Sequence, residues 1–88
     1  MSEAKVTVDH DTIKHWVERG GGRPARVKRT GKGDDPGVLR IDFGEPDESL
    51  EVISWDEFFE KFEERHLALL YQDEANSRFN KLIDRRQH

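Results

Sequence analysis

The 88-residue chain contains no cysteine, which excludes a disulfide framework and a thiolate zinc site. It also has no run near the roughly 18 apolar residues that a membrane helix needs. Its N-terminal residues, MSEAKVTVDHD, lack the apolar stretch of a signal peptide. We therefore expect a cytoplasmic protein that does not interact with a membrane.

Hydrophobic residues are few, at 33 %, whereas charged residues make up 39 % of the chain. This balance is typical of a small, highly solvated domain with a modest core. We expect one domain over residues 1–88, with residues 1–8 frayed, residues 84–88 forming a flexible tail, and a monomeric state.

The net charge of −4 is distributed unevenly along the sequence. Between Arg19 and Gly33 there are six basic residues and no acid, whereas Asp34–Glu64 holds twelve acids and two bases. Such polarity can steer a charged partner toward the protein. Alternatively, the basic segment folds beside the acidic one and the charges pair internally.

The first periodic segment is DHDTIKHWVERGGG. Asp9 is a good N-cap, Trp16 and Val17 continue the helical face that Ile13 begins, and Gly20 is placed to take the left-handed position that ends a helix. The pattern predicts a helix over residues 10–19, with a short extended piece before it at residues 5–8.

Alternation of apolar and polar residues then predicts three strands. They are ARVKRT at residues 25–30, GVLRIDF at residues 37–43 and LEVIS at residues 50–54. The links between them are short and rich in turn residues, which favours an antiparallel meander.

The strongest local signal is ISWDEFFEKFEERH. Ser54 and Glu57 form a capping box, and Phe58, Phe59 and Phe62 make one apolar face, so we expect a helix that ends near residue 65. Its phenylalanines should pack against the sheet.

The segment LALLYQ, residues 67–72, is either a fourth strand or a continuation of that helix; alternation favours the strand. Apolar spacing in DEANSRFNKLIDRRQH predicts a C-terminal helix over residues 74–85. The fold class is therefore α+β, in the order α-β-β-β-α-β-α, with a small, mostly antiparallel sheet packed against helices.

The stretches HWVERGGGRPARVKRTG, GVLRIDF and SWDEFFEKFEERHLALLYQD resemble a family of small bacterial proteins of uncharacterised function, over residues 10–73. Members often carry the label 1,4-alpha-glucan branching enzyme, so the resemblance implies a carbohydrate-related role. Enzymes of that chemistry resemble (β/α)₈ barrels of about 250 residues, and this chain is too short for such a barrel. The resemblance therefore assigns no catalytic residue.

The stretch GGGRPARVKR, residues 20–29, is the most distinctive candidate site. Its Gly-Arg-Pro core matches minor-groove hooks of DNA-binding chains, whereas the glycines also suit a joint between a helix and a strand. Strand alternation places basic side chains where they could contact phosphates. The candidate binding surface is Arg23, Arg26, Lys28, Arg29 and Lys32, and Trp16 and Trp55 are candidates for stacking a base.

Catalytic and metal sites are less well supported. Asp11 and His15 are four residues apart on the first helix, but two ligands on a surface helix make a poor metal site, so we expect no metal and no cofactor. The chain has no cysteine nucleophile and no recognisable serine–histidine–acid spacing, and we predict no catalytic residue. An enzyme or carbohydrate binder would need a concave pocket holding two carboxylates, or an exposed tryptophan.

These observations favour a small non-catalytic interaction or regulatory module that binds a macromolecular partner, most simply a protein. Nucleic-acid binding through the basic segment 19–32 is the alternative. A carbohydrate-related role is the second alternative.

Overall fold

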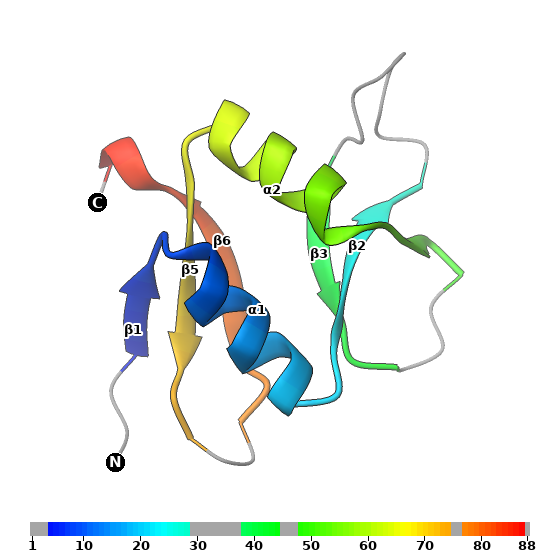
Figure 1. Cartoon of the computed structure of the whole chain (residues 1–88), viewed down its shortest axis with the longest axis horizontal. Coiled ribbons are helices and arrows are strands. Elements are labelled where there is room, and N and C mark those ends of the chain that lie inside the picture. Colours follow the sequence, from blue (N-terminus) through cyan, green and yellow to red (C-terminus); the bar gives the residue numbers. More distant parts are fainter. Residues whose placement is uncertain (1–3, 29–37, 45–47, 75–76, 88) are drawn as a thin grey trace.

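The computed structural model describes residues 4–28, 38–44, 48–74 and 77–87 (Figure 1). It is an α+β fold, as the sequence predicts. Along the chain the elements are β1 (Ala4–Thr7), α1 (His10–Arg19), β2 (Arg23–Val27), β3 (Leu39–Asp42), β4 (Leu50–Val52), α2 (Trp55–Glu64), β5 (Leu67–Gln72), β6 (Asn80–Asp84) and a 3₁₀ helix at Arg85–Gln87.

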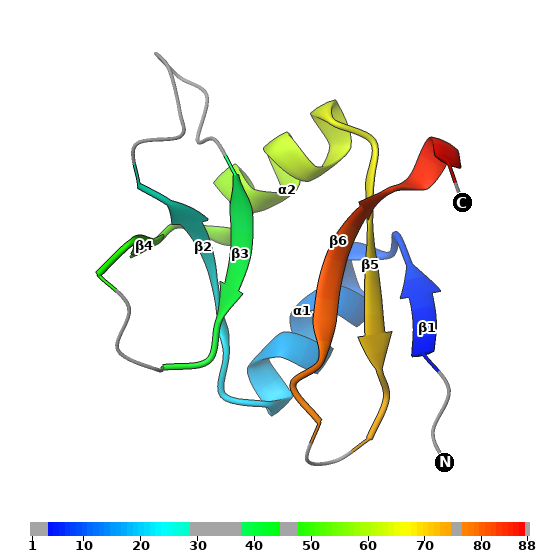
Figure 2. The same ribbon diagram turned by 180° about the vertical axis from the view of Figure 1, so that it is seen from behind.

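The strands form two three-stranded antiparallel sheets, in the orders β1-β5-β6 and β3-β2-β4. Both helices lie on the same side of the two sheets, in front of them in Figure 1 and behind them in Figure 2. The predicted meander is wrong, because β4 pairs with β2 and leaves β3 at an edge. β2 is therefore paired on both sides.

Helix α1 has the predicted bounds. Asp9 accepts a hydrogen bond from the Thr12 amide at 2.9 Å, and Ile13 and Val17 are fully buried. The prediction for Gly20 is wrong: its φ is −83°, and Gly21 takes the left-handed conformation with φ of 78°. Helical hydrogen bonding extends to the Gly20 amide, so the cap moves one residue along the chain.

Helix α2 begins as its capping box predicts, with the Ser54 hydroxyl accepting from the Glu57 amide at 3.1 Å. Phe58 and Phe62 are fully buried and form the centre of the core. The core joins both helices to both sheets, through Ile13, Trp16, Val17, Leu39, Ile41, Phe58, Phe62, Leu69 and Tyr71.

The strand interpretation of residues 67–72 is confirmed, because they form β5. The predicted C-terminal helix over residues 74–85 is wrong: residues 80–84 form β6 and pair with β5. Leu82 packs against the core, whereas Ile83 lies opposite Ala68 on the other face. Pairing with the buried strand β5 outweighs the helical spacing of Phe79, Leu82 and Ile83, and Phe79 is left 49 % exposed.

The two chain ends belong to the same sheet. The extended piece expected before α1 is confirmed as β1, which pairs with β5 on the side opposite β6. After β6, the Arg85 side chain donates to the Leu67 carbonyl at 2.7 Å and to both Glu63 carboxylate oxygens at 3.2 Å. These bonds hold the 3₁₀ turn against α2.

Candidate functional site

The three glycines between α1 and β2 serve the fold. The Gly21 amide bonds to the Glu18 carbonyl at 3.0 Å and the Gly22 amide to the Val17 carbonyl at 2.8 Å, the pair of bonds that defines a Schellman cap. This confirms the interpretation of the glycines as a joint. An anion site is not expected here, because a helix C-terminus presents carbonyl groups and the negative end of the dipole.

The predicted basic surface is divided between two faces of the sheet. Arg23 and Arg26 are three residues apart in β2, so their side chains point to opposite faces. Arg26 lies opposite Glu51 of β4 and pairs with its carboxylate at 2.5 Å. Lys28 is exposed just beyond the end of β2, and Arg29 and Lys32 lie outside the described residues.

Both predicted stacking residues make contacts within the protein. Trp16 is only 5 % exposed, and its indole nitrogen donates to the Gln72 carbonyl at 3.1 Å. Trp55 is half-buried, with its ring stacked on Phe59 at a centroid distance of 5.2 Å. Both rings therefore contribute to the core and its edge.

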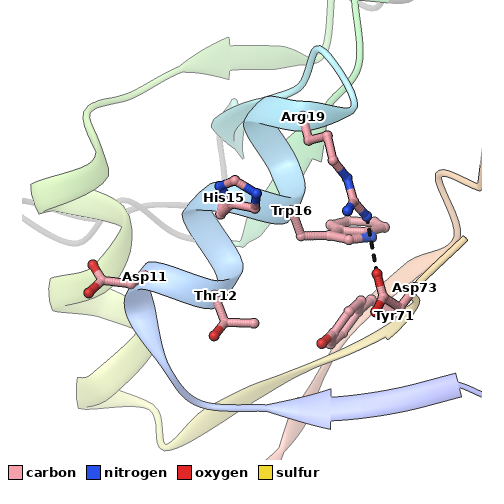
Figure 3. A pocket seen from close by; sticks show the side chains of 7 residues that line it. All are labelled: Asp11, Thr12, His15, Trp16, Arg19, Tyr71 and Asp73. Carbon is pink, nitrogen blue, oxygen red and sulfur yellow. Dashed lines mark hydrogen bonds and ion pairs between the residues drawn. The ribbon is translucent and has the colours of Figure 1, made fainter. Parts of the chain in front are cut away.

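A depression of about 460 Å³ lies beside α1 (Figure 3). Its lining residues are Asp11, Thr12, His15, Trp16, Arg19, Tyr71 and Asp73. Arg19 pairs with Asp73 at 3.1 Å, and Lys5 pairs with the same carboxylate at 3.2 Å. The depression holds two carboxylates, but Figure 3 shows Asp11 pointing away from Tyr71 and Asp73.

The electrostatics of this depression do not fit acid–base chemistry on a sugar. Hydrogen bonds from Arg19 and Lys5 lower the pKa of Asp73, so that carboxyl stays ionised at neutral pH. Glycoside chemistry needs one of its two carboxyl groups kept protonated by a raised pKa, and the two must flank one bond. Asp73 does not meet the first condition, and Asp11 points away from it, so the two carboxylates do not flank one bond.

Figure 2 shows the two sheets from the side opposite the helices. The side chains on this face form two rows. Strand register places Lys81, Leu70 and Val6 in one row across the first sheet. Arg40, Ala25 and Val52 form the matching row across the second sheet. Both rows face away from the helices, because their neighbours along the strands pack in the core: Leu69, Tyr71, Leu82, Leu39 and Ile41.

The two rows meet at their basic ends. Arg40 and Lys81 are both exposed and line one cavity of about 330 Å³ between β3 and β6, together with Leu39, Asn80 and Leu82. At the outer ends of the rows, Val6 is 41 % exposed and Val52 is 49 % exposed. Between these ends Leu70 is half-buried and Ala25 is fully buried, so the exposed part of the rows lies at the two cations and the two valines. We call these six residues (Val6, Leu70, Lys81, Arg40, Ala25 and Val52) the open-face strip.

The predicted binding residues did not include Arg40 or Lys81. The signal for Arg40 is present in the sequence, since Leu39 and Ile41 flank it with the alternation of a half-buried strand. Lys81 lies in the segment predicted as a helix, so its place on a sheet face could not be inferred from that prediction.

Within residues 4–28, 38–44, 48–74 and 77–87, no three histidine or acidic side chains come together as a metal site requires. No helix in those ranges is both long and apolar enough to cross a bilayer. No family model, curated protein or solved structure matches the chain.

Proposed function

We propose that this protein is a small non-catalytic interaction module that binds a protein partner on the helix-free face of its two sheets. The observation that carries the proposal is the open-face strip, with cations at its centre and exposed valines at its ends. Protein-binding surfaces commonly combine apolar contacts with charges that select the partner.

Charge pairing distinguishes the two faces of the sheets. On the helix side, Arg19, Arg26 and Arg85 each pair with a carboxylate from another part of the chain. On the helix-free face, the charged side chains of the strands are Arg23, Arg40, Lys81 and Asp42, a formal net charge of +2. Among the described residues, none of those three cations is within ion-pair distance of a carboxylate.

A basic surface on a chain of net charge −4 favours an acidic protein segment over a long polyanion. A nucleic acid would approach the acidic side chains of the chain as well as its cations, and the exposed valines of the strip offer nothing to phosphates. Nucleic-acid binding through the basic segment 19–32 remains the alternative. Two of its cations, Arg26 and Arg19, already pair within the protein.

The proposal includes the cytoplasm as the place of action and membership of the small bacterial family that the motifs resemble. The lack of cysteine supports the first part. The second is supported by the distinctive SWDEFFEKFEERHLALLYQ segment, which supplies the buried residues Phe58, Phe62 and Leu69. Because these residues are buried, the shared segment implies a shared core. The label of branching enzyme would require catalytic residues outside this segment.

Site-specific photo-crosslinking in cells tests the proposed face. A photoreactive phenylalanine analogue replaces Val52 on the open-face strip or, as the matched control, Lys14 on the exposed side of α1. We expect a discrete crosslinked protein from position 52 and none from position 14. A product from position 14 alone would place the partner on the helix side and refute the proposal.

A further inference from the structure

The two sheets present unpaired strand edges to each other. At the two ends of β6, the Phe79 carbonyl accepts from the Gln72 amide at 3.4 Å and the Arg85 amide donates to the His66 carbonyl at 2.8 Å, both on the β5 side. Antiparallel pairing alternates along a strand, so the backbone groups of Asn80 and Leu82 point away from β5. They point toward β3, with which β6 forms no ladder.

The same alternation applies to β3. The Val38 carbonyl bonds to the Val27 amide at 2.8 Å, on the β2 side, so the backbone groups of Leu39 and Ile41 point away from β2 and toward β6. The Arg40 guanidinium donates to the Leu39 carbonyl at 3.0 Å, which occupies one acceptor at this edge. Within the described part of the chain, the amides of Leu39 and Leu82 are donors without a strand partner. We call this gap between β3 and β6 the seam.

The seam is too narrow for another strand in the plane of the sheets. The Cα atoms of β3 and β6 approach within 8 Å, whereas an inserted strand needs about 10 Å, twice the usual strand spacing. One end is also fastened, since the Arg78 guanidinium lies 5.5 Å above the Phe43 ring. A side chain from a segment lying over the open face can still enter the 330 Å³ cavity.

The lining of the seam selects an anion. The side chains of Leu39 and Leu82 close its inner end against the core, and Arg40 and Lys81 stand at its mouth. The amides of Leu39 and Leu82, which point into the seam, add two donors. A carboxylate can accept hydrogen bonds from such amides and from both cations at once. Among the described residues, no acidic side chain lines the cavity to compete for these donors.

Resting on the proposed function, we infer that the seam receives an aspartate or glutamate side chain from an extended acidic segment of the partner. The segment crosses the strands along the open-face strip and places apolar residues over Val6 and Val52. From the seam, each valine lies about two and a half strand spacings away, roughly 12 Å. An extended chain covers that distance in three to four residues, so the motif has an acidic centre with apolar residues about four positions to each side.

An NMR titration with defined peptides tests the inference on the whole chain. The probe is a nine-residue peptide with blocked ends, three central glutamates, a valine at each end and serines between them. We expect the amide signals of Leu39 and Leu82 to shift, and the matched glutamine peptide to leave them in place. K81Q and R40Q should each weaken binding about fivefold, the upper end for an exposed ion pair, whereas K14Q, the same charge change on α1, should not weaken it.

The other outcomes separate the two proposals. If the peptide shifts Val6 and Val52 but K81Q binds it equally well, the open face is a binding surface and the seam inference is wrong. If no signal moves while crosslinking from position 52 still captures a protein, the partner does not use an acidic segment of this design, and the seam inference again fails. Tighter binding of a twelve-thymidine single strand, weakened by K81Q, would assign the seam to phosphates and overturn both proposals.

Discussion

Replacing Gly22 with alanine tests whether the glycines between α1 and β2 provide flexibility or space. A Cβ atom at Gly22 would lie 2.8 Å and 2.9 Å from two carbons of the Phe43 ring and 3.0 Å from a Val17 methyl carbon. Such distances require the ring to move. Phe43 also packs edge-on against Trp16 at 5.9 Å and carries the Arg78 guanidinium, so the movement disturbs both contacts.

We expect Gly22→Ala to destabilise the fold by about 2 kcal/mol, within the range for overpacked sites. Phe43 is half-buried, so its ring can partly yield, and the upper end of that range is not reached. For a domain of this size, the change corresponds to a fall in Tm of about 8–16 °C. Urea denaturation followed by tryptophan fluorescence measures it directly.

Two further variants separate steric from conformational effects. Gly21→Ala meets nothing within 4 Å but must adopt a φ of 78°, which costs about 1 kcal/mol. Phe43→Leu replaces the ring by a smaller side chain, which should remove much of the destabilisation caused by Gly22→Ala. A double-mutant cycle of these two substitutions should then give a coupling energy of about 1 kcal/mol. If Gly22 only provided flexibility, alanine would stabilise the protein by about 0.4–1 kcal/mol, and that sign would refute the reasoning.

Three other predictions concern the core, a helix cap and an acidic group. Phe62→Ala should cost about 3–5 kcal/mol, because the ring is fully buried, and calorimetry should show a large fall in Tm or an unfolded chain. Ser54→Ala should cost about 1 kcal/mol in urea denaturation by removing the cap of α2, whereas Ser54→Asp should keep most of it. Hydrogen bonds from Arg86 lower the pKa of Asp84 to about 2, so its contribution to stability is present above pH 3.8 and is lost as the pH falls toward 2. A carbon-detected NMR titration should show that midpoint, and Arg86→Gln should return it toward 3.8; an unchanged midpoint in that variant would contradict the assignment.

Sequence reasoning succeeded where local chemistry decides the structure. Both helices begin at capped residues, Asp9 and Ser54, whose side chains satisfy the first free amides. It failed for residues 74–85, where the spacing of Phe79, Leu82 and Ile83 fits a helix and a strand nearly as well. The unpaired edge of β5 decides between them, and that edge depends on contacts between distant parts of the chain.

The candidate site also depends partly on local patterns and partly on contacts between distant strands. The alternation around β2 predicted a basic surface that could contact phosphates, but not that Arg23 and Arg26 lie on opposite faces or which face the helices would cover. Arg40 and Lys81 come together only because β3 and β6 are both edge strands, and strand order cannot be inferred from local patterns. The seam therefore could not be found before the arrangement of the strands was known.

The placement of β1 and β6 on either side of β5 has a consequence for the order of folding. The second sheet and α2 are built from the continuous stretch between Arg23 and Glu64, so their contacts join residues that are closer in the sequence. The first sheet instead joins Ala4 to Gln72 and Leu67 to Asp84, and closing the longer of these loops carries a larger entropic cost. During synthesis, β2, β3 and β4 can pair before β5, the partner strand of β1, has been made. The sheet that supplies Lys81 is completed only after Asp84 has left the ribosome.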